Sequence, residues 1–544
     1  MKSRAESTNF QETSRYADVV KFFTELAAAS PLIRQETFGH SVEGRALPLV
    51  ILADPPVAHP QEAVAAGKTI VFVMANIHAG EVEGKEALQP LALRIARGDL
   101  HPLLQNLVIL FAPIYNADGN ERIDVHNRTD QYGPVGGVGI RENARGLDLN
   151  RDYMKLEAPE SKSLVALFNR WDPHLTVDLH TTDGSYHAYH LTYSPTLNPC
   201  ADPRLIAFER DQLLPAVTSA MRLRHNFRTY YYGNFSTREA LGSELERFAA
   251  ARPGEPVVTK VWRTFDHRPR FGNNYVGLRN RLTILSEAYS HLDFPGRVKV
   301  TGAFVEEILQ YANAHAGEIR ALTHQVDVDQ SHPGNAARPP LGVEFSLHPL
   351  PEEVDLLVGD VTQIKHPVTG IPMIAMVEDK VVPTRMPDYG AFAATRTVPG
   401  AHAYLFAPAP GMTNVLSNLR EHGVRVEELT APLTVPADKF HLTDVKHAAR
   451  PFAGHRATRL TGKFVTETQT FPEGTVIVRC TQPLGRLVAY LLEPESDDGL
   501  VTWNFLDEQL RVGQDYPIWK VVESIANAPT RVVAPPPAAN QPAR

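Results

Sequence analysis

Residues 69–88 read TIVFVMANIHAGEVEGKEAL, and this stretch decides the fold. Its first seven residues are mostly apolar, which is typical of a strand buried on both faces. His78 and Glu81 follow where that strand ends, and a helical pattern begins directly after them. A buried strand that delivers two polar side chains to a strand-to-helix turn indicates an α/β protein with a site at the end of a central strand.

The alternation of strand and helix patterns recurs along the first part of the chain. Strand-like segments lie at 47–54, 106–116, 174–180 and 281–290, and helical patterns lie at 16–30, 81–98, 158–171 and 301–322. Such alternation predicts a doubly wound, mixed but mostly parallel sheet. In sheets of this kind the active site lies outside the carboxyl ends of the strands.

A second region follows the predicted sheet. Residues 324–340, HQVDVDQSHPGNAARPP, are polar and contain Pro and Gly, so we expect a linker between a catalytic domain at 1–323 and a C-terminal domain at 341–526. Short strands and one strand–helix–strand segment at 403–429 predict a mixed α+β fold for the second domain. The end of the chain, 527–544, is predicted to be disordered.

Composition narrows the range of partners. The 544 residues carry a formal net charge of -8, from 54 basic and 62 acidic side chains, so no nucleic-acid partner is expected. No run of about 18 apolar residues is present, so no membrane span is expected. The first residues lack the apolar core of a signal peptide, and a cytoplasmic location is expected if this N-terminus is the natural one.

Polar side chains gather at the ends of several predicted strands. One strand runs into His78 and Glu81, another ends with Asp178 and His180, and a third ends with Glu287. Catalytic zinc is commonly held by three His or carboxylate ligands with one position left for water, so His78, Glu81 and His180 are candidate ligands for Zn2+. Asp178, two positions before His180 on the same strand face, would orient that histidine.

A further carboxylate and a set of donors complete the candidate site. Glu287 would lie near the metal, in the position of a general base. The segment RENARGLDLNRDY at 141–153 carries Arg141, Asn150 and Arg151, whose fixed donors suit a carboxylate or an oxyanion. A lone H-x-x-E or D-x-H pattern is common by chance, so the prediction depends on the combination of all these motifs in this order.

The combination resembles the zinc metallocarboxypeptidases of the carboxypeptidase A family. The motifs are HAGE at 78–81, RENARGLDLNRD at 141–152, VDLH at 177–180 and LTILSE at 282–287. The resemblance covers roughly residues 16–322 and implies a carboxypeptidase-like fold. It also implies one zinc ion per chain bound by His78, Glu81 and His180, with Glu287 activating a water molecule.

The same resemblance implies roles for the donors. Arg141 would polarise the scissile carbonyl and stabilise the oxyanion, while Asn150 and Arg151 would hold the terminal carboxylate of a peptide or peptide-like substrate. No tyrosine has the family's spacing for a substrate cap, so Tyr275 and the run 230–232 are only candidates. The family also suggests a periplasmic or extracellular protein, which the visible N-terminus does not support.

Other interpretations stay open. A zinc acylase or amidase that acts on N-acyl amino acids or peptidoglycan-type amides would use the same carboxylate-binding donors. A non-catalytic zinc-holding binding module would not need Glu287, and a structural zinc site would need four protein ligands. His174, His187 and His190 are interpreted as loop or cleft-lining residues. The acidic segment LEPESDDGLVTW at 492–503 lacks the spacing of a calcium loop and is interpreted as a solvated turn.

Overall fold

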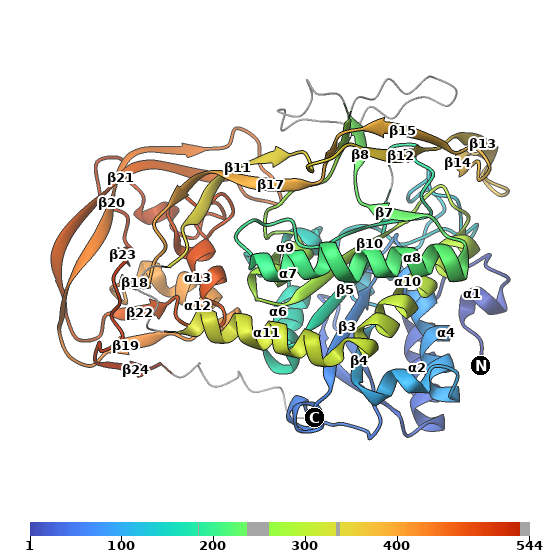
Figure 1. The fold of residues 1–544 in the computed structure, drawn as a ribbon, viewed down its shortest axis with the longest axis horizontal. Coiled ribbons are helices and arrows are strands. Elements are labelled where there is room, and N and C mark those ends of the chain that lie inside the picture. Colours follow the sequence, from blue (N-terminus) through green and yellow to red (C-terminus); the bar gives the residue numbers. More distant parts are fainter. Residues whose placement is uncertain (183, 237–260, 333–337, 534–544) are drawn as a thin grey trace.

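Residues 69–75 form β3 (Thr69–Ala75), a strand buried along its whole length near the middle of an eight-stranded sheet. The computed structural model describes residues 1–182, 184–236, 261–332 and 338–533, and the sheet has the order β1-β2-β4-β3-β5-β10-β6-β7 (Figure 1). Its other strands are β1 (Ile33–His40), β2 (Ala46–Leu52), β4 (Leu107–Ala112), β5 (Leu175–Thr182), β6 (Leu191–Ser194), β7 (Thr229–Tyr231) and β10 (Leu282–Tyr289).

The parallel direction of the central strands brings their carboxyl ends to the same side of the sheet. β3 runs parallel to β4 and β5, and β5 runs parallel to β10, so the carboxyl ends of these strands meet. Antiparallel pairs of β1 with β2, β2 with β4 and β6 with β10, and a parallel pair of β6 with β7, complete the sheet. The predicted α/β class with a mixed, mostly parallel sheet is therefore confirmed.

Helices pack against this sheet, and β3, β4 and β5 are consequently buried at every residue. The helices of the first region are α1 (Arg4–Ser7), α2 (Tyr16–Ala29), α3 (Pro60–Ala65), α4 (Glu83–Arg97), α5 (Ala117–Glu121), α6 (Pro159–Trp171), α7 (Pro203–Phe208), α8 (Leu214–His225), α9 (Gly272–Leu278), α10 (Phe294–Ala314) and α11 (Ala316–Ser331). The one helix predicted at 301–322 is thus divided into α10 and α11.

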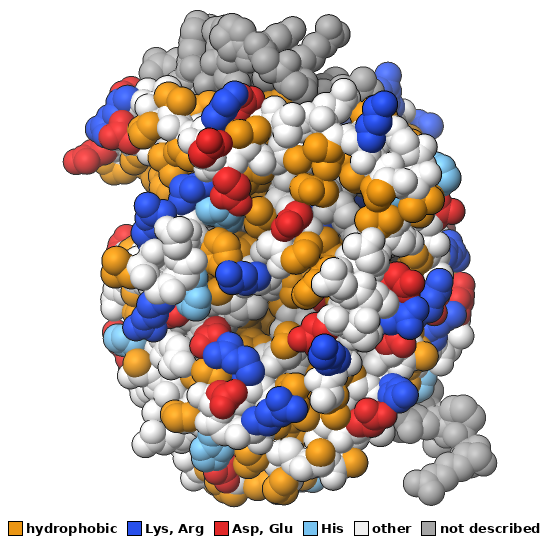
Figure 2. Space-filling view, turned by 90° about the vertical axis from the view of Figure 1, so that its right-hand side faces the viewer, with side chains coloured by type: hydrophobic (Ala, Val, Ile, Leu, Met, Phe, Trp, Pro, Cys, Tyr) orange, Lys and Arg blue, Asp and Glu red, His pale blue; other side chains and the backbone are white. Residues whose placement is uncertain are grey.

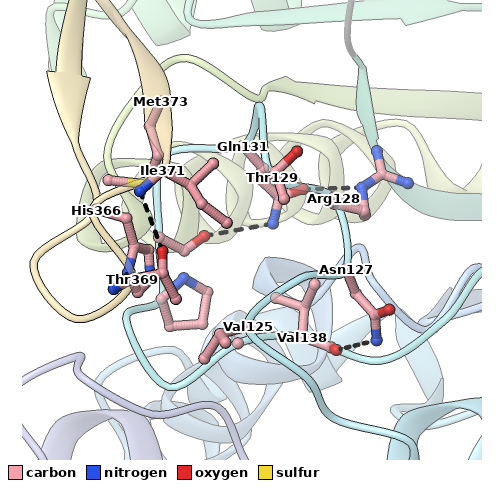
Figure 3. Close-up of a pocket in the computed structure, with 13 residues that line it drawn as sticks. Val125, Asn127, Arg128, Thr129, Gln131, Val138, His366, Thr369, Ile371 and Met373 are labelled. Atoms are coloured by element: carbon pink, nitrogen blue, oxygen red, sulfur yellow. Dashed lines mark hydrogen bonds between the residues drawn. The ribbon is translucent and has the colours of Figure 1, made fainter.

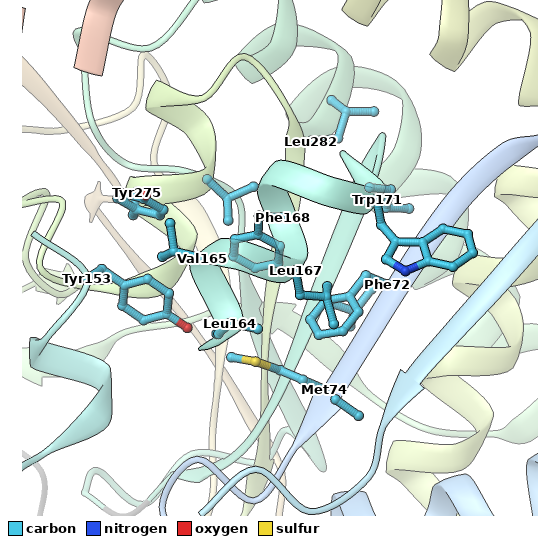
Figure 4. Packing of buried hydrophobic residues seen from close by; sticks show 14 of the residues in the cluster. Phe72, Met74, Tyr153, Leu164, Val165, Leu167, Phe168, Trp171, Tyr275 and Leu282 are labelled. Atoms are coloured by element: carbon cyan, nitrogen blue, oxygen red, sulfur yellow. The ribbon is translucent and has the colours of Figure 1, made fainter. Parts of the chain in front are cut away.

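The core beside α6 shows how the apolar residues of β3 are used. Figure 4 shows Phe72 and Met74 of β3 packed near Leu164, Leu167 and Phe168 of α6, all of them buried. The rings of Phe72 and Phe168 meet edge to face, with their centroids 5.5 Å apart. Aromatic pairs favour this edge-to-face geometry. The three α6 residues are spaced so that they lie on one face of the helix.

The predicted linker 324–340 is wrong in its first part, because α11 continues through it to Ser331. Val326 is fully buried, and the Gln330 side-chain amide donates to the Cys480 carbonyl at 2.8 Å. Contacts with distant parts of the chain therefore hold this polar segment in a helix, overriding its composition. The rest of the predicted linker lies partly outside the described residues.

The C-terminal region is a mixed α+β structure, as predicted, and lies on the left of Figure 1. Its seven-stranded sheet has the order β21-β20-β23-β18-β22-β19-β24. The elements are β18 (Ala403–Phe406), α12 (Thr413–Glu421), β19 (Glu427–Leu429), β20 (Leu433–His447), β21 (Thr458–Phe471), β22 (Val476–Arg479), α13 (Gly485–Leu492), β23 (Trp519–Val521) and β24 (Thr530–Val532). Because β24 pairs with β19, the disorder predicted for 527–544 is wrong for that strand, and 534–544 lie outside the described residues.

Short strands between the two regions reach back over the first one, along the top of Figure 1. They are β11 (Leu341–His348), β12 (Val354–Val358), β13 (Val361–Lys365), β14 (Pro372–Met376), β15 (Val382–Met386), β16 (Asp388–Tyr389) and β17 (Ala391–Val398). β16 joins β8 (Asn234–Ser236) and β9 (Val261–Arg263) in a three-stranded sheet. The predicted domains 1–323 and 341–526 therefore share secondary structure, and the boundary between them stays a prediction.

Charges of both signs are mixed on the surface. Figure 2 shows Lys and Arg side chains interspersed with Asp and Glu across one face of the molecule, with hydrophobic side chains between them. Such a mixture is usual for protein surface that faces water. In the part of the chain that the structure describes, no helix has the length and apolar character needed to cross a membrane.

The buried position of β3 makes a stability prediction. Phe72 is fully buried, so Phe72→Ala should lower the free energy of unfolding by about 3–5 kcal/mol, through lost burial and the cavity left behind. Val64 is 67% exposed, and Val64→Ala is the matched control, expected to change stability by less than about 0.5 kcal/mol. Urea unfolding measures both. Equal losses for the two variants would contradict the central position of β3.

Candidate active site

The predicted metal ligands meet where β3 and β5 end. His78 and Glu81 lie in the turn between β3 and α4, and His180 lies near the carboxyl end of β5. Ligand atoms of these three buried residues all lie within 4.8 Å of one another. Asn76, the first residue after β3, has a φ of 68° and so turns the chain sharply, a conformation that Asn tolerates better than most residues.

The two histidines present the same ring nitrogen to Glu81. Nδ1 of His78 lies 3.1 Å from one carboxylate oxygen of Glu81, and Nδ1 of His180 lies 2.9 Å from the other. Each Nε2 faces a second carboxylate, Asp148 at 3.1 Å and Asp178 at 2.9 Å, respectively. A carboxylate favours the tautomer with the proton on Nε2, which leaves both Nδ1 lone pairs available to a metal. This donor set fits a metal ion such as zinc.

Arg128 is a site residue that the sequence patterns did not indicate. Its Nη1 donates to Glu81 at 3.0 Å, across a separation of 47 residues, and its Nη2 donates to the Thr181 carbonyl at 3.2 Å. Burial alone would raise the pKa of Glu81, but His78 and Arg128 hold that pKa well below its usual range. Glu81 therefore stays ionised, which is the form that a metal ligand requires.

A hairpin from the later chain closes over the loop that carries Arg128. Figure 3 shows His366, Thr369 and Ile371 of the β13–β14 hairpin facing Gln131 of this loop around a cavity of about 20 Å³. That volume has room for about one water molecule and not for a substrate. Arg128 Nε donates to the Gln131 side-chain oxygen at 3.1 Å. Gln131 of the loop therefore supports Arg128, and the cavity beside it is too small for a second substrate site.

Glu287 lies beside His180. In the parallel pair of β5 with β10, Glu287 is opposite His180, so their side chains share one face of the sheet. Leu285, two residues earlier, lies on the same face, and both residues line the cleft that contains the three proposed ligands. A carboxylate at this place can accept a proton from a water molecule near a metal.

Asp148 connects the ligands to Arg141. Its Oδ2 accepts from Arg141 Nε at 2.9 Å, while its Oδ1 lies 3.1 Å from His78 Nε2. Burial alone would raise the pKa of Asp148, but the contacts with His78 and Arg141 hold it far below its usual range. Arg141 also lies 3.9 Å from the Glu81 carboxylate, at the border of the metal group. Asp148 is part of the quoted motif, but its contact with His78 was not predicted.

Asn150 and Arg151 follow on the same short segment and are held by the chain that begins α9. The Gly272 amide donates to Asn150 Oδ1 at 3.0 Å, and the Arg151 guanidinium carbon lies 3.8 Å from the centre of the Phe271 ring. Burial lowers the pKa of Arg151 to about 10, so the group stays a cation at neutral pH. Both side chains line the cleft and can offer donors to an anion.

All of the predicted site residues except Asp178 line one cleft of about 1270 Å³. This volume is ample for a peptide end, since pockets for small ligands commonly measure about 300–1,000 Å³. The later chain supplies much of the opposite wall, through Phe345, Ser346, Leu347, Phe392, Lys446, His447, Ala448, Phe452, Ala457, Arg459, Asp497 and Thr502. A bound substrate would therefore contact both regions of the protein.

Comparison with known proteins agrees with this geometry. A family model described as zinc carboxypeptidase matches residues 19–250. Carboxypeptidase 2 of Trichophyton equinum is 22% identical over 516 residues, which cover 88% of this chain and 81% of that relative. Carboxypeptidase D of Rattus norvegicus is 32% identical over 182 residues, which cover 28% of this chain and 13% of that relative. Residues 19–250 therefore form a zinc carboxypeptidase domain.

Solved metallocarboxypeptidases are similar to part of the chain. The metallo-carboxypeptidase from Burkholderia cenocepacia is 17% identical with a TM-score of 0.39, covering 56% of this chain and 70% of that one. The metallo-carboxypeptidase from Pseudomonas aeruginosa is 19% identical with a TM-score of 0.38, covering 57% of this chain and 70% of that one. The roles of single residues in this chain depend on the geometry of its own side chains.

The candidate tyrosines differ in whether they line the cleft. Tyr275 is fully buried, and its hydroxyl lies 2.8 Å from Nδ1 of His422, so it does not face the cleft. Tyr232 lines the cleft together with the predicted site residues. Of the candidates, Tyr232 is therefore the one placed to contact a substrate.

Neighbouring histidines lie outside the metal group, which comprises three side chains among the described residues. His174 accepts a hydrogen bond from the Ile70 amide at 3.1 Å, and His190 lies 2.7 Å from the Glu378 carboxylate. A group of three ligands suits a catalytic zinc site better than a structural one.

The interpretation of 492–503 as a solvated turn is wrong. Asp498 is fully buried, and Asp497 retains only 11% side-chain exposure. Both carboxylates form ion pairs with arginines of the segment that precedes α9. Composition alone suggested exposure because the partners lie more than two hundred residues away in the sequence.

The metal group predicts a difference between two histidines. His180→Ala removes one of three ligands and should reduce bound zinc from about one per chain to a small fraction. His190→Ala, a nearby change outside the group, should leave zinc content unchanged. Elemental analysis after dialysis measures both proteins. Equal zinc content in the two variants would contradict the assignment of His180.

Proposed function

We propose that this protein is a metallocarboxypeptidase that removes C-terminal residues from peptides, with one zinc ion per chain held by His78, Glu81 and His180. The observation that carries the proposal is the convergence of these three side chains with Glu287 and Arg151 in a single cleft. A metal site, a base and a cation for a terminal carboxylate are the groups that hydrolysis at a peptide end requires.

The proposed ligands fit zinc in chemistry as well as in spacing. Two neutral imidazoles and one carboxylate leave a further coordination position for water or substrate. When bound there, zinc would act as a Lewis acid that activates a water molecule and polarises the scissile carbonyl. Asp148 and Asp178 would hold the two imidazoles in the tautomer that ligation needs.

Glu287 would serve as the general base. Its place opposite His180, on the same face of the sheet and in the same cleft, supports this role. In the proposed reaction Glu287 takes a proton from the attacking water and then delivers it to the nitrogen of the leaving amino acid. A single carboxylate can perform both transfers because the attacking oxygen and the leaving nitrogen are bound to the same tetrahedral carbon.

Arg141 would stabilise the negative charge that develops on the carbonyl oxygen. Asp148 holds the Arg141 side chain through Nε, at 2.9 Å, so the guanidinium is oriented before substrate binds. Donors fixed in this way cost little reorganisation during the reaction. Arg128, which donates to the Glu81 carboxylate, would instead hold a ligand in place.

Asn150 and Arg151 would bind the terminal carboxylate of the substrate. Arg151 is a half-buried cation above the Phe271 ring, and the Asn150 side chain is oriented by the Gly272 amide. A planar guanidinium matches the two oxygens of a carboxylate. This pair would place the last peptide bond at the metal and restrict cleavage to chain ends.

The alternative functions are less well supported. Acylases and amidases that act on N-acyl amino acids or peptidoglycan-type amides could also use the carboxylate pair, but the similar relatives are named carboxypeptidases. A panel of N-blocked dipeptides and N-acyl amino acids, assayed with the zinc-loaded protein, tests the proposal. Turnover of the dipeptides supports it, and turnover of the N-acyl amino acids alone would replace it with an acylase.

The base assignment predicts a selective loss of turnover. Glu287→Gln should lower kcat by about 10²–10⁴-fold, because the amide cannot take a proton, while zinc content stays near that of wild type. Steady-state hydrolysis of an N-blocked dipeptide and elemental analysis measure the two quantities. Wild-type kcat in a zinc-loaded Glu287→Gln protein would refute the role.

The two arginines near Glu81 predict different defects. Arg141→Ala should lower kcat by about 10²–10³-fold and change KM far less, as expected for a donor used in the transition state. Arg128→Ala should instead weaken zinc retention against a chelator, by about 10–100-fold, because it removes a partner of a ligand. A change confined to KM in Arg141→Ala would contradict its oxyanion role.

A further inference from the structure

The segment 264–271 connects β9 to α9 and borders the proposed carboxylate subsite. Its last residue, Phe271, lies under the Arg151 guanidinium at 3.8 Å, and the next amide, that of Gly272, donates to Asn150 at 3.0 Å. Both residues proposed to bind the substrate carboxylate therefore rest on the end of this segment. A shift of the segment would move Arg151 and Asn150 directly.

Asp498 of the C-terminal region holds this segment one residue earlier. Its carboxylate accepts three hydrogen bonds from Arg270: from the backbone amide at 2.7 Å, from Nε at 2.9 Å and from Nη2 at 2.6 Å. The Arg270 guanidinium also lies 4.7 Å from the centre of the Trp503 ring and 5.1 Å from that of Phe452. Arg270 is thus fixed in position and orientation by side chains of the C-terminal region.

Asp497 makes a second set of contacts with the same segment. One oxygen lies 3.0 Å from His267 Nε2 and accepts from Arg268 Nε at 3.2 Å, while the other accepts from the Tyr490 hydroxyl. The His267 ring also lies between two rings of the later chain, those of Phe345 and Phe392, at 4.4 Å and 4.6 Å between centroids. The later chain therefore contacts the segment at His267, Arg268 and Arg270.

The buried Asp498 carboxylate and the Arg270 guanidinium compensate each other's charge, which favours keeping the two side chains in contact. Asp498 is fully buried, and the Arg270 side chain is only 10% exposed, so each charge depends on the other for compensation. A buried carboxylate left without its partner is strongly unfavourable. The multiple, directed bonds to the side chain and the backbone of one residue leave little freedom for the chain at Arg270.

We propose that Asp498 is a positioning residue for the substrate carboxylate: by fixing Arg270, it sets the place of Phe271 and Gly272 and thereby that of Arg151 and Asn150. The inference rests on the proposed carboxypeptidase function and extends it to the C-terminal region. That region completes the active site through the acidic pair 497–498 and is more than an attached domain.

The proposal predicts a defect in substrate binding rather than in chemistry. Asp498→Asn keeps the shape of the side chain and removes its charge. KM for an N-blocked dipeptide with a free carboxylate should rise about 10–100-fold, since small misplacements of positioning groups have effects of this size. kcat at saturation and zinc content should stay within about twofold of wild type, because the metal group and Glu287 are not displaced.

A substrate pair isolates the carboxylate subsite. The zinc-loaded full chain is assayed with the dipeptide acid and with its C-terminal amide, and the preference for the acid should fall in Asp498→Asn. Glu493→Gln is the matched control: Glu493 is also buried and also acidic, but it contacts Lys520 and Tyr404 within the C-terminal region. Glu493→Gln should keep the wild-type KM and acid preference. If the defect came only from general destabilisation of the C-terminal region, both variants would show it.

Each outcome decides one of the two proposals. An active Asp498→Asn protein with wild-type KM and acid preference would overturn the positioning role and leave the carboxypeptidase function intact. If Asp498→Asn does not fold, Asp497→Asn takes its place with the same expected results. If wild type cleaves neither substrate, the proposed function fails, and calorimetric binding of N-acetyl-leucine decides the inference: unchanged affinity in the variant, or no binding to wild type, overturns it.

Discussion

The buried carboxylate of Glu81 is the group on which the rest of the site depends. It contacts His78 from its own turn, His180 from a neighbouring strand and Arg128 from a distant loop. A buried charge without compensation would be costly, so the fold has to bring these partners to one point. The ends of central parallel strands can do this because packing on both faces holds them rigidly.

The arrangement extends outward from Glu81 by direct contacts. Asp148 joins His78 to Arg141, and two and three residues later the same segment carries Asn150 and Arg151. One short stretch of chain therefore orients a proposed metal ligand and carries the proposed oxyanion donor and the proposed carboxylate subsite. This stretch packs against the end of the segment 264–271, and Asp497 and Asp498 of the C-terminal region hold that segment by hydrogen bonds and ion pairs. Displacement at one of these contacts would be transmitted to the next because the residues touch one another directly.

The main strands and the metal group were predictable because their signals are local. Runs of apolar residues identify buried strands, and His78, Glu81 and His180 stand where such runs end. Arg128 was not predictable, since it lies in a loop without periodicity. The errors at 324–331 and 492–503 have a common cause: both segments are polar, and side chains in both are held by partners far away in the sequence.

By itself, the sequence determined the α/β class, the strand ends that carry the proposed ligands and base, and the resemblance to the zinc carboxypeptidase family. Only the tertiary structure decided that Arg128 supports Glu81, that the later chain forms the second wall of the cleft and that Asp498 holds Arg270. The physical reason is the sequence separation over which each kind of interaction acts. Periodicity and motif spacing act over a few turns or strand lengths, whereas the compensation of a buried charge depends on where the whole chain places its partner.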